Sequence, residues 1–334
     1  MAAARLGGDR VVYLDATGSE SWSSGSAESA LHARRCRAAV FGELVQWSAL
    51  RALPMDTAAD DDGSMALSMH TAAERPDLWE RGIPSEEVWP EYNLHGDDLN
   101  RWWQHLDVEL ADFQFVLFDE ERDEVVAEGH TGPLWWDGSD DTLPDGIDAA
   151  IEQIFTRLRA KHPANTLCAL AAETPRGGRA RGLAAELLQA MRRIGERHGL
   201  THFIAPVRPA LKERYPLTPI GRYVTWRRDD GQLLDPWMRV HERLGARVSV
   251  PLPRSLLITG TVDEWEAWTG MAFPDSDDYV FPEGLAPVRI DRAADRGTYW
   301  EPNVWMIHPD LQASTRPVDG ASPGTGDVRP RDVR

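Results

Sequence analysis

Hydrophobic and polar positions along this chain follow two different periods, and the changes of period predict a series of helices and strands. Residues 113–118 and 166–172 are short apolar runs typical of buried strands, and residues 124–131 predict the return strand of a hairpin. Apolar positions three and four apart in residues 146–161 predict an amphipathic helix. Weaker patterns predict helices over 97–110 and 235–244 and strands over 202–207, 247–249 and 256–259. The chain is therefore expected to combine helices and strands.

The two ends of the chain lack such periodicity. Residues 17–29 and 56–64 are dominated by small and acidic residues, and small, polar and proline residues prevail after Pro309. We therefore expect residues 1–71 to be a disordered extension and residues 310–334 a disordered tail. Residues 72–309 are then expected to form one folded domain, with an insertion over 210–237.

The most informative stretch is a turn rich in glycine and arginine at residues 176–184. It lies between the apolar strand 166–172 and a helix that places Leu187, Met191 and Ile194 on one face. The first turn of a helix has free N–H groups, and glycine lets an anion approach the backbone. Because three arginines add positive charge here, the turn predicts a binding site for an anion such as a pyrophosphate.

These residues resemble the GNAT superfamily of acetyl-CoA-dependent N-acetyltransferases. The family signature is Gln or Arg, two residues, Gly, one residue, and Gly or Ala, and it is met by Arg179-Ala180-Arg181-Gly182-Leu183-Ala184. The order of strands and helices over residues 110–260 also follows the family. The resemblance implies an α+β fold: a mixed, mainly antiparallel sheet flanked by helices, here with the long insertion and a Trp-rich C-terminal extension.

The resemblance also implies how acetyl-CoA, the acyl donor, would bind. Backbone groups of Leu170, Ala171 and Ala172 would pair with the pantetheine, as a neighbouring strand would. The backbone amides of residues 179–184 would hold the pyrophosphate: Arg179, Ala180, Arg181, Gly182, Leu183 and Ala184. The strand over 202–207 would diverge from its neighbour and leave room for the thioester.

Two residues are the first candidates for catalysis. Glu173 ends the apolar strand, so it is the nearest carboxylate in sequence to the expected thioester and a candidate general base. Glu128 and His130, on the preceding hairpin, are further candidates. The family usually has a Tyr acid in a Tyr-Glu-Lys-Leu-Gly-like segment, and His241 stands at that position. Either His241 protonates the leaving thiolate, or this chain lacks that acid.

The expected acceptor is the amine of a small molecule, which would attack the thioester directly in a ternary complex. The aromatic residues Tyr215, Tyr223 and Trp226 of the insertion are candidates to line its site. Trp237, Trp265, Trp268, Trp300 and Trp305 fall beyond the usual family core and are weaker candidates for the same pocket.

Composition and charge limit the remaining choices. The 334 residues carry a formal charge of −18, which argues against nucleic acid and anionic membranes as partners. The two cysteines match no zinc spacing or disulfide framework, so no metal and a cytoplasmic location are expected. We expect a monomer or homodimer. Two alternatives stay open: a GNAT-like module that binds CoA without turnover, and an acyltransferase that uses a longer acyl donor.

Overall fold

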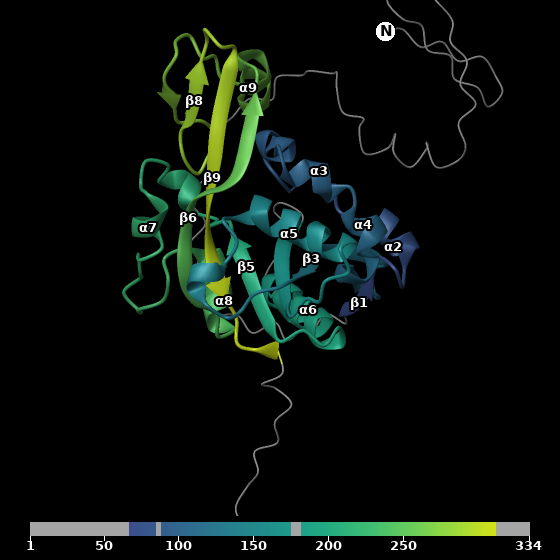
Figure 1. Cartoon of the computed structure of the whole chain (residues 1–334). Coiled ribbons are helices and arrows are strands. Elements are labelled where there is room, and N and C mark those ends of the chain that lie inside the picture. Colours follow the sequence, from purple (N-terminus) through teal and green to yellow (C-terminus); the bar gives the residue numbers. More distant parts are fainter. Residues whose placement is uncertain (1–66, 85–87, 175–181, 312–334) are drawn as a thin grey trace, which may run out of the picture. The chain divides into compact units, whose positions relative to one another are not determined.

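A computed structural model describes residues 67–84, 88–174 and 182–311 (Figure 1). In this part of the chain nine strands form one sheet in the order β1-β2-β3-β4-β5-β9-β8-β7, with β6 paired to β9. β4 and β5 are parallel, and every other pairing is antiparallel. The strands are β1 (Leu67–Thr71), β2 (Gln114–Asp119), β3 (Glu124–Leu134), β4 (Thr166–Glu173), β5 (His202–Val207), β6 (Arg247–Gly260), β7 (Asp278–Tyr279), β8 (Val288–Asp291) and β9 (Arg296–Ile307).

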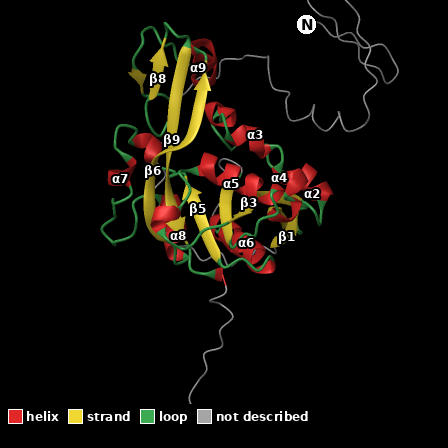
Figure 2. Ribbon diagram, viewed as in Figure 1, coloured by secondary structure: helices red, strands yellow, loops and turns green. Residues whose placement is uncertain are grey.

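Helices pack against this sheet, as Figure 2 shows in red beside the yellow strands. The α-helices are α2 (Pro76–Glu80), α3 (Leu99–Trp103), α4 (Leu106–Glu109), α5 (Ile147–Arg159), α6 (Leu183–Arg197), α7 (Ile220–Tyr223), α8 (Pro236–Arg243) and α9 (Val262–Thr269). Short 3₁₀ helices are η2 (Glu91–His95), η3 (Ala111–Phe113), η4 (Asp140–Thr142) and η5 (Lys212–Arg214). α5 and α6 bury the apolar faces that their sequence periodicity predicts. The mixed, mainly antiparallel α+β fold is therefore confirmed.

Two predicted elements differ from the structure. The helix expected over 97–110 is divided into α3 and α4, which are separated at Gln104 and His105. The strands expected at 247–249 and 256–259 are two parts of β6, whose pairing with β9 shifts register on both sides of Leu252. Pro251 and Pro253 flank that residue, and a proline has no N–H to donate to a ladder. Because of these register shifts, the hydrophobic pattern of residues 247–260 does not show that they form one strand.

The sheet also extends beyond the expected domain limits. β1 pairs with β2 over its whole length, so ordered structure begins before residue 72. At the other end Leu311 is fully buried, and Arg192 of α6 donates hydrogen bonds to the carbonyls of Pro309 and Asp310. The remainder of the two expected disordered segments, 1–66 and 312–334, lies outside the described residues.

The C-terminal strand belongs to the centre of the sheet. β9 lies between β5 and β6, pairing with β5 through residues 304–307. Trp305 is fully buried in it and donates its indole N–H to the Pro144 carbonyl at 2.9 Å. Trp265 is also fully buried, among Tyr92, Phe281 and Tyr299. Trp265 and Trp305 therefore belong to the hydrophobic core of the domain.

β4 and β5 separate part-way along their length. Their parallel pairing covers only Thr166–Cys168 and His202–Ile204. Beyond that point β4 continues along β3 to Glu173, whereas β5 pairs with β9 to Val207. We call this divergence the splay; its closed end is at the paired residues, and its open end is where the two strands finish. The divergence that the family resemblance implied is confirmed.

Candidate active site

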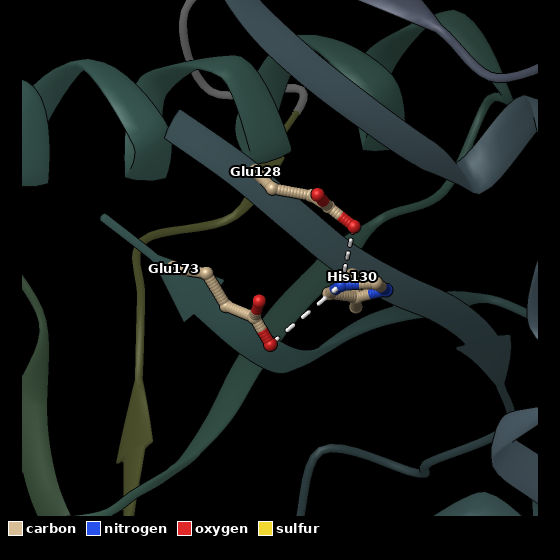
Figure 3. A group of neighbouring side chains, drawn as sticks. All are labelled: Glu128, His130 and Glu173. Atoms are coloured by element: carbon tan, nitrogen blue, oxygen red, sulfur yellow. Dashed lines mark ion pairs between the residues drawn. The ribbon is translucent and has the colours of Figure 1, made fainter. Parts of the chain in front are cut away.

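Three polar side chains converge near the end of β4. The antiparallel register places Glu128 of β3 opposite Glu173 of β4, and His130 opposite Ala171. His130 Nε2 lies 3.1 Å from Glu128 Oε1 and 3.8 Å from Glu173 Oε1 (Figure 3). All three residues are at most 5% exposed. The structure therefore unites the three carboxylate and imidazole candidates from the hairpin and the apolar strand into one buried cluster.

Each carboxylate of this cluster also accepts a hydrogen bond from outside it. The backbone N–H of Ile83 donates to Glu128 Oε2 at 3.0 Å, and the indole N–H of Trp89 donates to Glu173 Oε1 at 2.7 Å. The rings of Trp79 and Trp103 pack against His130, with centroids 5.4 and 4.8 Å away. Charged side chains are buried at low cost only when such partners hold them. The cluster is thus fixed in orientation by α2, α3 and the segment that follows α2.

The arrangement of these three side chains is suited to binding a cation or to transferring a proton. Two carboxylates beside an imidazole attract an amine, and either carboxylate can accept its proton. The ligand atoms of all three residues lie within 4.8 Å of one another, so the same set could hold a divalent metal ion. Glu173 ends β4, the strand that borders the open end of the splay, and Glu128 and His130 lie on the neighbouring β3.

The residues expected to pair with pantetheine directly precede Glu173 on β4. Leu170, Ala171 and Ala172 lie past the last residue of β4 that pairs with β5. Among the described strands, Ala171 and Ala172 pair only with β3, and Leu170 lies at the register shift of that pairing.

Gly182 caps the N-terminus of α6, and Leu183 and Ala184 form its first turn. The φ of Gly182 is +91°, and a Cβ placed there would meet no atom of the described chain within 4 Å. Gly182 therefore uses the conformational freedom of glycine at the start of α6. Arg179, Ala180 and Arg181 lie outside the described residues.

His241 lies at the opposite end of the splay from Glu173. Its Nδ1 is 2.9 Å from Nε2 of His308, whose ring stacks on Phe203 at 4.2 Å. Phe203 is paired with Leu167, at the closed end. At about 3.3 Å per residue, Leu167 is about 20 Å from Glu173 along β4.

The chemistry of His241 also differs from that of an acid. Burial, with a smaller contribution from His308, lowers the pKa of His241 well below its ordinary value, so the imidazole is neutral at pH 7. A neutral imidazole is a poor proton donor for a thiolate. The structure thus favours the second reading of this position, in which the chain lacks the family's usual acid there.

The aromatic candidates of the insertion do lie together. Tyr215 packs against Trp226 and Tyr223, with centroids 4.9 and 6.1 Å apart. Tyr223 is buried and donates its hydroxyl to Asp235 Oδ2 at 2.8 Å, so it holds the insertion onto the N-cap of α8. Tyr215 is 40% exposed and Trp226 is half-buried. Tyr215 and Trp226 therefore keep surface available for a ligand, whereas Tyr223 is committed to structure.

Sequence reasoning missed a second polar group at the open end of the splay. Arg208 directly follows β5 and forms an ion pair with the buried Glu301 of β9 at 3.2 Å. Tyr92 and Asn93 of η2 donate hydrogen bonds to Glu301. These residues are far apart in sequence and form no motif, so only the topology of the sheet could have revealed them.

No family model matches the chain. An arginine N-acetyltransferase of Aspergillus versicolor, avaD, is 31% identical over 274 residues, which cover 72% of this chain and 93% of that protein. The loading GNATL domain of CurA from Lyngbya majuscula is 17% identical, with a TM-score of 0.46, over 74% of this chain and 98% of that one. A phosphinothricin acetyltransferase from Sinorhizobium meliloti, solved with AcCoA, is 13% identical, with a TM-score of 0.34, over 78% of this chain and 98% of that one. Because both TM-scores lie below 0.5, family membership rests on the fungal relative together with the motif.

The relative, whose match covers 72% of this chain, identifies an acyltransferase of the N-acetyltransferase type. The chain belongs to the GNAT superfamily. It is an acyl-CoA-dependent N-acyltransferase that acts on an amine, which decides against the alternative of a module that binds CoA without turnover. Among the described residues, no helix is long and apolar enough to cross a membrane.

Proposed function

We propose that this enzyme transfers the acetyl group of acetyl-CoA to an amine of a small molecule, and that the acceptor is a cationic amino acid such as arginine. The observation that carries the proposal is the buried cluster of Glu128, His130 and Glu173 beside the open end of the splay. Two carboxylates favour a cationic acceptor over a neutral one. The fungal relative, an arginine N-acetyltransferase, supports the same class.

In the proposed reaction the free amine attacks the thioester carbonyl carbon. A carbon–nitrogen bond forms, the carbon–sulfur bond breaks, and CoA leaves as a thiolate that takes up the proton released by the acylated nitrogen. The ammonium form of the acceptor must first lose its proton, and Glu173 is proposed to accept it. Because Glu173 ends β4, directly after the segment proposed to bind pantetheine, base and thioester would lie close together.

The acyl donor is proposed to bind along β4 and at the start of α6. The backbone of Leu170, Ala171 and Ala172 would pair with the pantetheine, in place of the missing β5 partner. The amides of residues 179–184 would hold the pyrophosphate, favoured by the positive end of α6. Tyr215, Tyr223 and Trp226 are proposed as the acceptor-side wall, with contact made by Tyr215 and Trp226.

Neither deprotonation of the acceptor nor attack on the thioester requires a resident metal, because Glu173 serves as the base and a thioester is already reactive toward amines. We further propose a cytoplasmic monomer or homodimer with no nucleic-acid or membrane partner, in line with the charge of −18. Dialysis against a chelator should leave turnover unchanged if the metal-free mechanism is correct.

The direct test measures thiol release from acetyl-CoA by the purified full chain, with arginine, lysine, agmatine and a neutral amine as acceptors. We expect turnover with arginine, a product heavier by one acetyl group, and binding of desulfo-CoA. Thiol release only with neutral amines would refute the cationic acceptor. Turnover only with longer acyl-CoAs would refute acetyl as the group transferred.

A further inference from the structure

The segment of residues 89–93 contacts both sides of the open end of the splay. At its start, Trp89 donates its indole N–H to Glu173 Oε1 at 2.7 Å, on the β4 side. At its end, Tyr92 and Asn93 donate to the two carboxylate oxygens of Glu301 at 3.3 and 3.0 Å, on the β5–β9 side. We call residues 89–93 the strap.

The register of the sheet shows why the strap bridges the splay. In the parallel pairing Thr166 lies opposite His202. If this offset is continued beyond the last paired residues, Ala172 corresponds to Arg208. The anchors of the strap, Glu173 and the Arg208–Glu301 pair, are thus at the same height on diverging strands. From Trp89 to Asn93 the chain spans at most roughly 14 Å. The strap therefore limits how far apart the two sides can lie.

The two ends of the strap are held very differently. The hydroxyl of Tyr92 accepts a hydrogen bond from Arg208 Nη2 at 3.0 Å, and its ring packs in the aromatic core against Phe281, Tyr299 and Trp265. Trp89 is only half-buried, and its indole N–H donates to Glu173. Tyr92 therefore anchors the strap in the core, and Trp89 at the other end contacts Glu173, the proposed base.

Resting on the proposed role of Glu173, we propose that Trp89 is a positioning residue for the transfer reaction. Its N–H binds Oε1 and sets the rotation of the carboxylate, which directs the second oxygen for proton transfer. Through the strap, this alignment depends on Arg208 and Glu301 across the splay.

The test compares Trp89→Phe with Trp102→Phe in the full chain. Phenylalanine keeps an aromatic ring but has no N–H. Trp102 is the matched control because it stacks on Phe155, and its indole nitrogen is buried with no hydrogen-bond partner among the described residues. We expect Trp89→Phe to lower kcat about tenfold with the KM for acetyl-CoA unchanged. Trp102→Phe should change neither.

A second readout does not depend on activity. In protein labelled with ¹⁵N-tryptophan, the indole signal that disappears in Trp89→Phe belongs to Trp89, and we expect it to move in Glu173→Gln. An unmoved Trp89 signal, or an unchanged kcat in Trp89→Phe, would overturn the positioning role. If wild-type protein turns over no amine, the proposed function fails, whereas the indole signal still reports whether Trp89 senses Glu173.

Discussion

The two buried histidine clusters of this protein differ in what faces the imidazole. At the open end of the splay, His130 lies between the carboxylates of Glu128 and Glu173. At the closed end, His241 faces a second imidazole, that of His308. Both clusters are almost inaccessible to solvent. The open-end cluster buries two carboxylates beside an imidazole, whereas the closed-end cluster consists of two neutral imidazoles.

This difference shows that burial alone does not identify a catalytic histidine. Burial lowers the pKa of His308 to about 3, so at neutral pH the pair contributes packing and one hydrogen bond. The carboxylate cluster stays polar because an indole, a backbone amide and an imidazole stabilise its charges. Four predictions test whether residues at the open end take part in catalysis and residues at the closed end stabilise the fold.

The largest effect is expected at the acyl-donor side of the open end. Gly182→Glu places a carboxylate at the N-terminus of α6, where we propose that the pyrophosphate binds. We expect at least about hundredfold weaker acetyl-CoA binding by calorimetry, because two anions cannot share that position.

Gly199→Glu is the matched control for this substitution. Gly199 lies just past the other end of α6, its φ is also positive at +66°, and a Cβ there would meet no atom of the described chain within 4 Å. Both variants therefore place a glutamate at a positive φ beside α6, but only one has the charge at the proposed anion site. Equal loss of affinity in both would refute the placement of the pyrophosphate.

Glu173→Gln is expected to have the next largest effect. The amide keeps the shape of the side chain but cannot accept the proton of the acceptor, so kcat should fall by about 10²–10³. The Kd for acetyl-CoA should stay the same. Glu128→Gln, which leaves the proposed base intact, should lower kcat only about tenfold through a weaker cationic site. A kcat of Glu173→Gln within threefold of the wild-type value would exclude Glu173 as the base.

Much of the fold could be predicted because its elements have strong local signals. The apolar run of β4 and the amphipathic face of α6 reflect contacts with the core that every such element needs. β9 was missed because its twelve residues mix glycine, proline and polar groups with apolar ones. Its position between β5 and β6 depends on long-range pairing, which no local pattern encodes.

The candidate site was predictable only in part. Glu173 was found because it ends an obvious strand, and Glu128 and His130 because they lie on the adjoining hairpin. The register that brings them together required the structure. Trp89 and Arg208 come from segments without regular periodicity, so nothing in their local sequence indicates that they meet Glu173 at the end of β4 and Glu301 in the middle of β9. His241 illustrates the opposite problem, since a matching sequence position did not reveal its buried, neutral environment.

At the closed end, His241→Ala should affect stability far more than catalysis. Removing a fully buried side chain leaves a cavity and deprives His308 of its partner, which should lower the free energy of unfolding by about 3 kcal/mol. We expect kcat to stay within about twofold at a temperature where the variant is folded. Urea denaturation measures the first quantity, and the exposed His162→Ala serves as control. A large fall in kcat with wild-type stability would restore His241 as the acid.

The smallest effect concerns the pH dependence of stability. Histidines 241 and 308 have folded pKa values below 6.5, so below that pH the unfolded chain binds protons that the folded chain does not. Each histidine therefore removes about 1.4 kcal/mol of stability per pH unit on acidification. Asp148 acts in the opposite direction, because burial raises its pKa to about 6 and the folded chain takes up its proton first. Between pH 6 and pH 5 the net loss should be about 1.4 kcal/mol.

Two variants separate these contributions by urea denaturation at pH 6 and pH 5. His308→Gln keeps a hydrogen-bonding partner for His241 but does not titrate, so stability should become nearly independent of pH in this range. Asp148→Asn removes the opposing proton uptake and should steepen the loss to about 2.7 kcal/mol per pH unit. If His308→Gln retained the wild-type slope, the closed-end pair would not be neutral in the folded protein. The contrast between the carboxylate cluster at the open end and a neutral histidine pair at the closed end would then be lost, because His241 and His308 would be able to carry a proton.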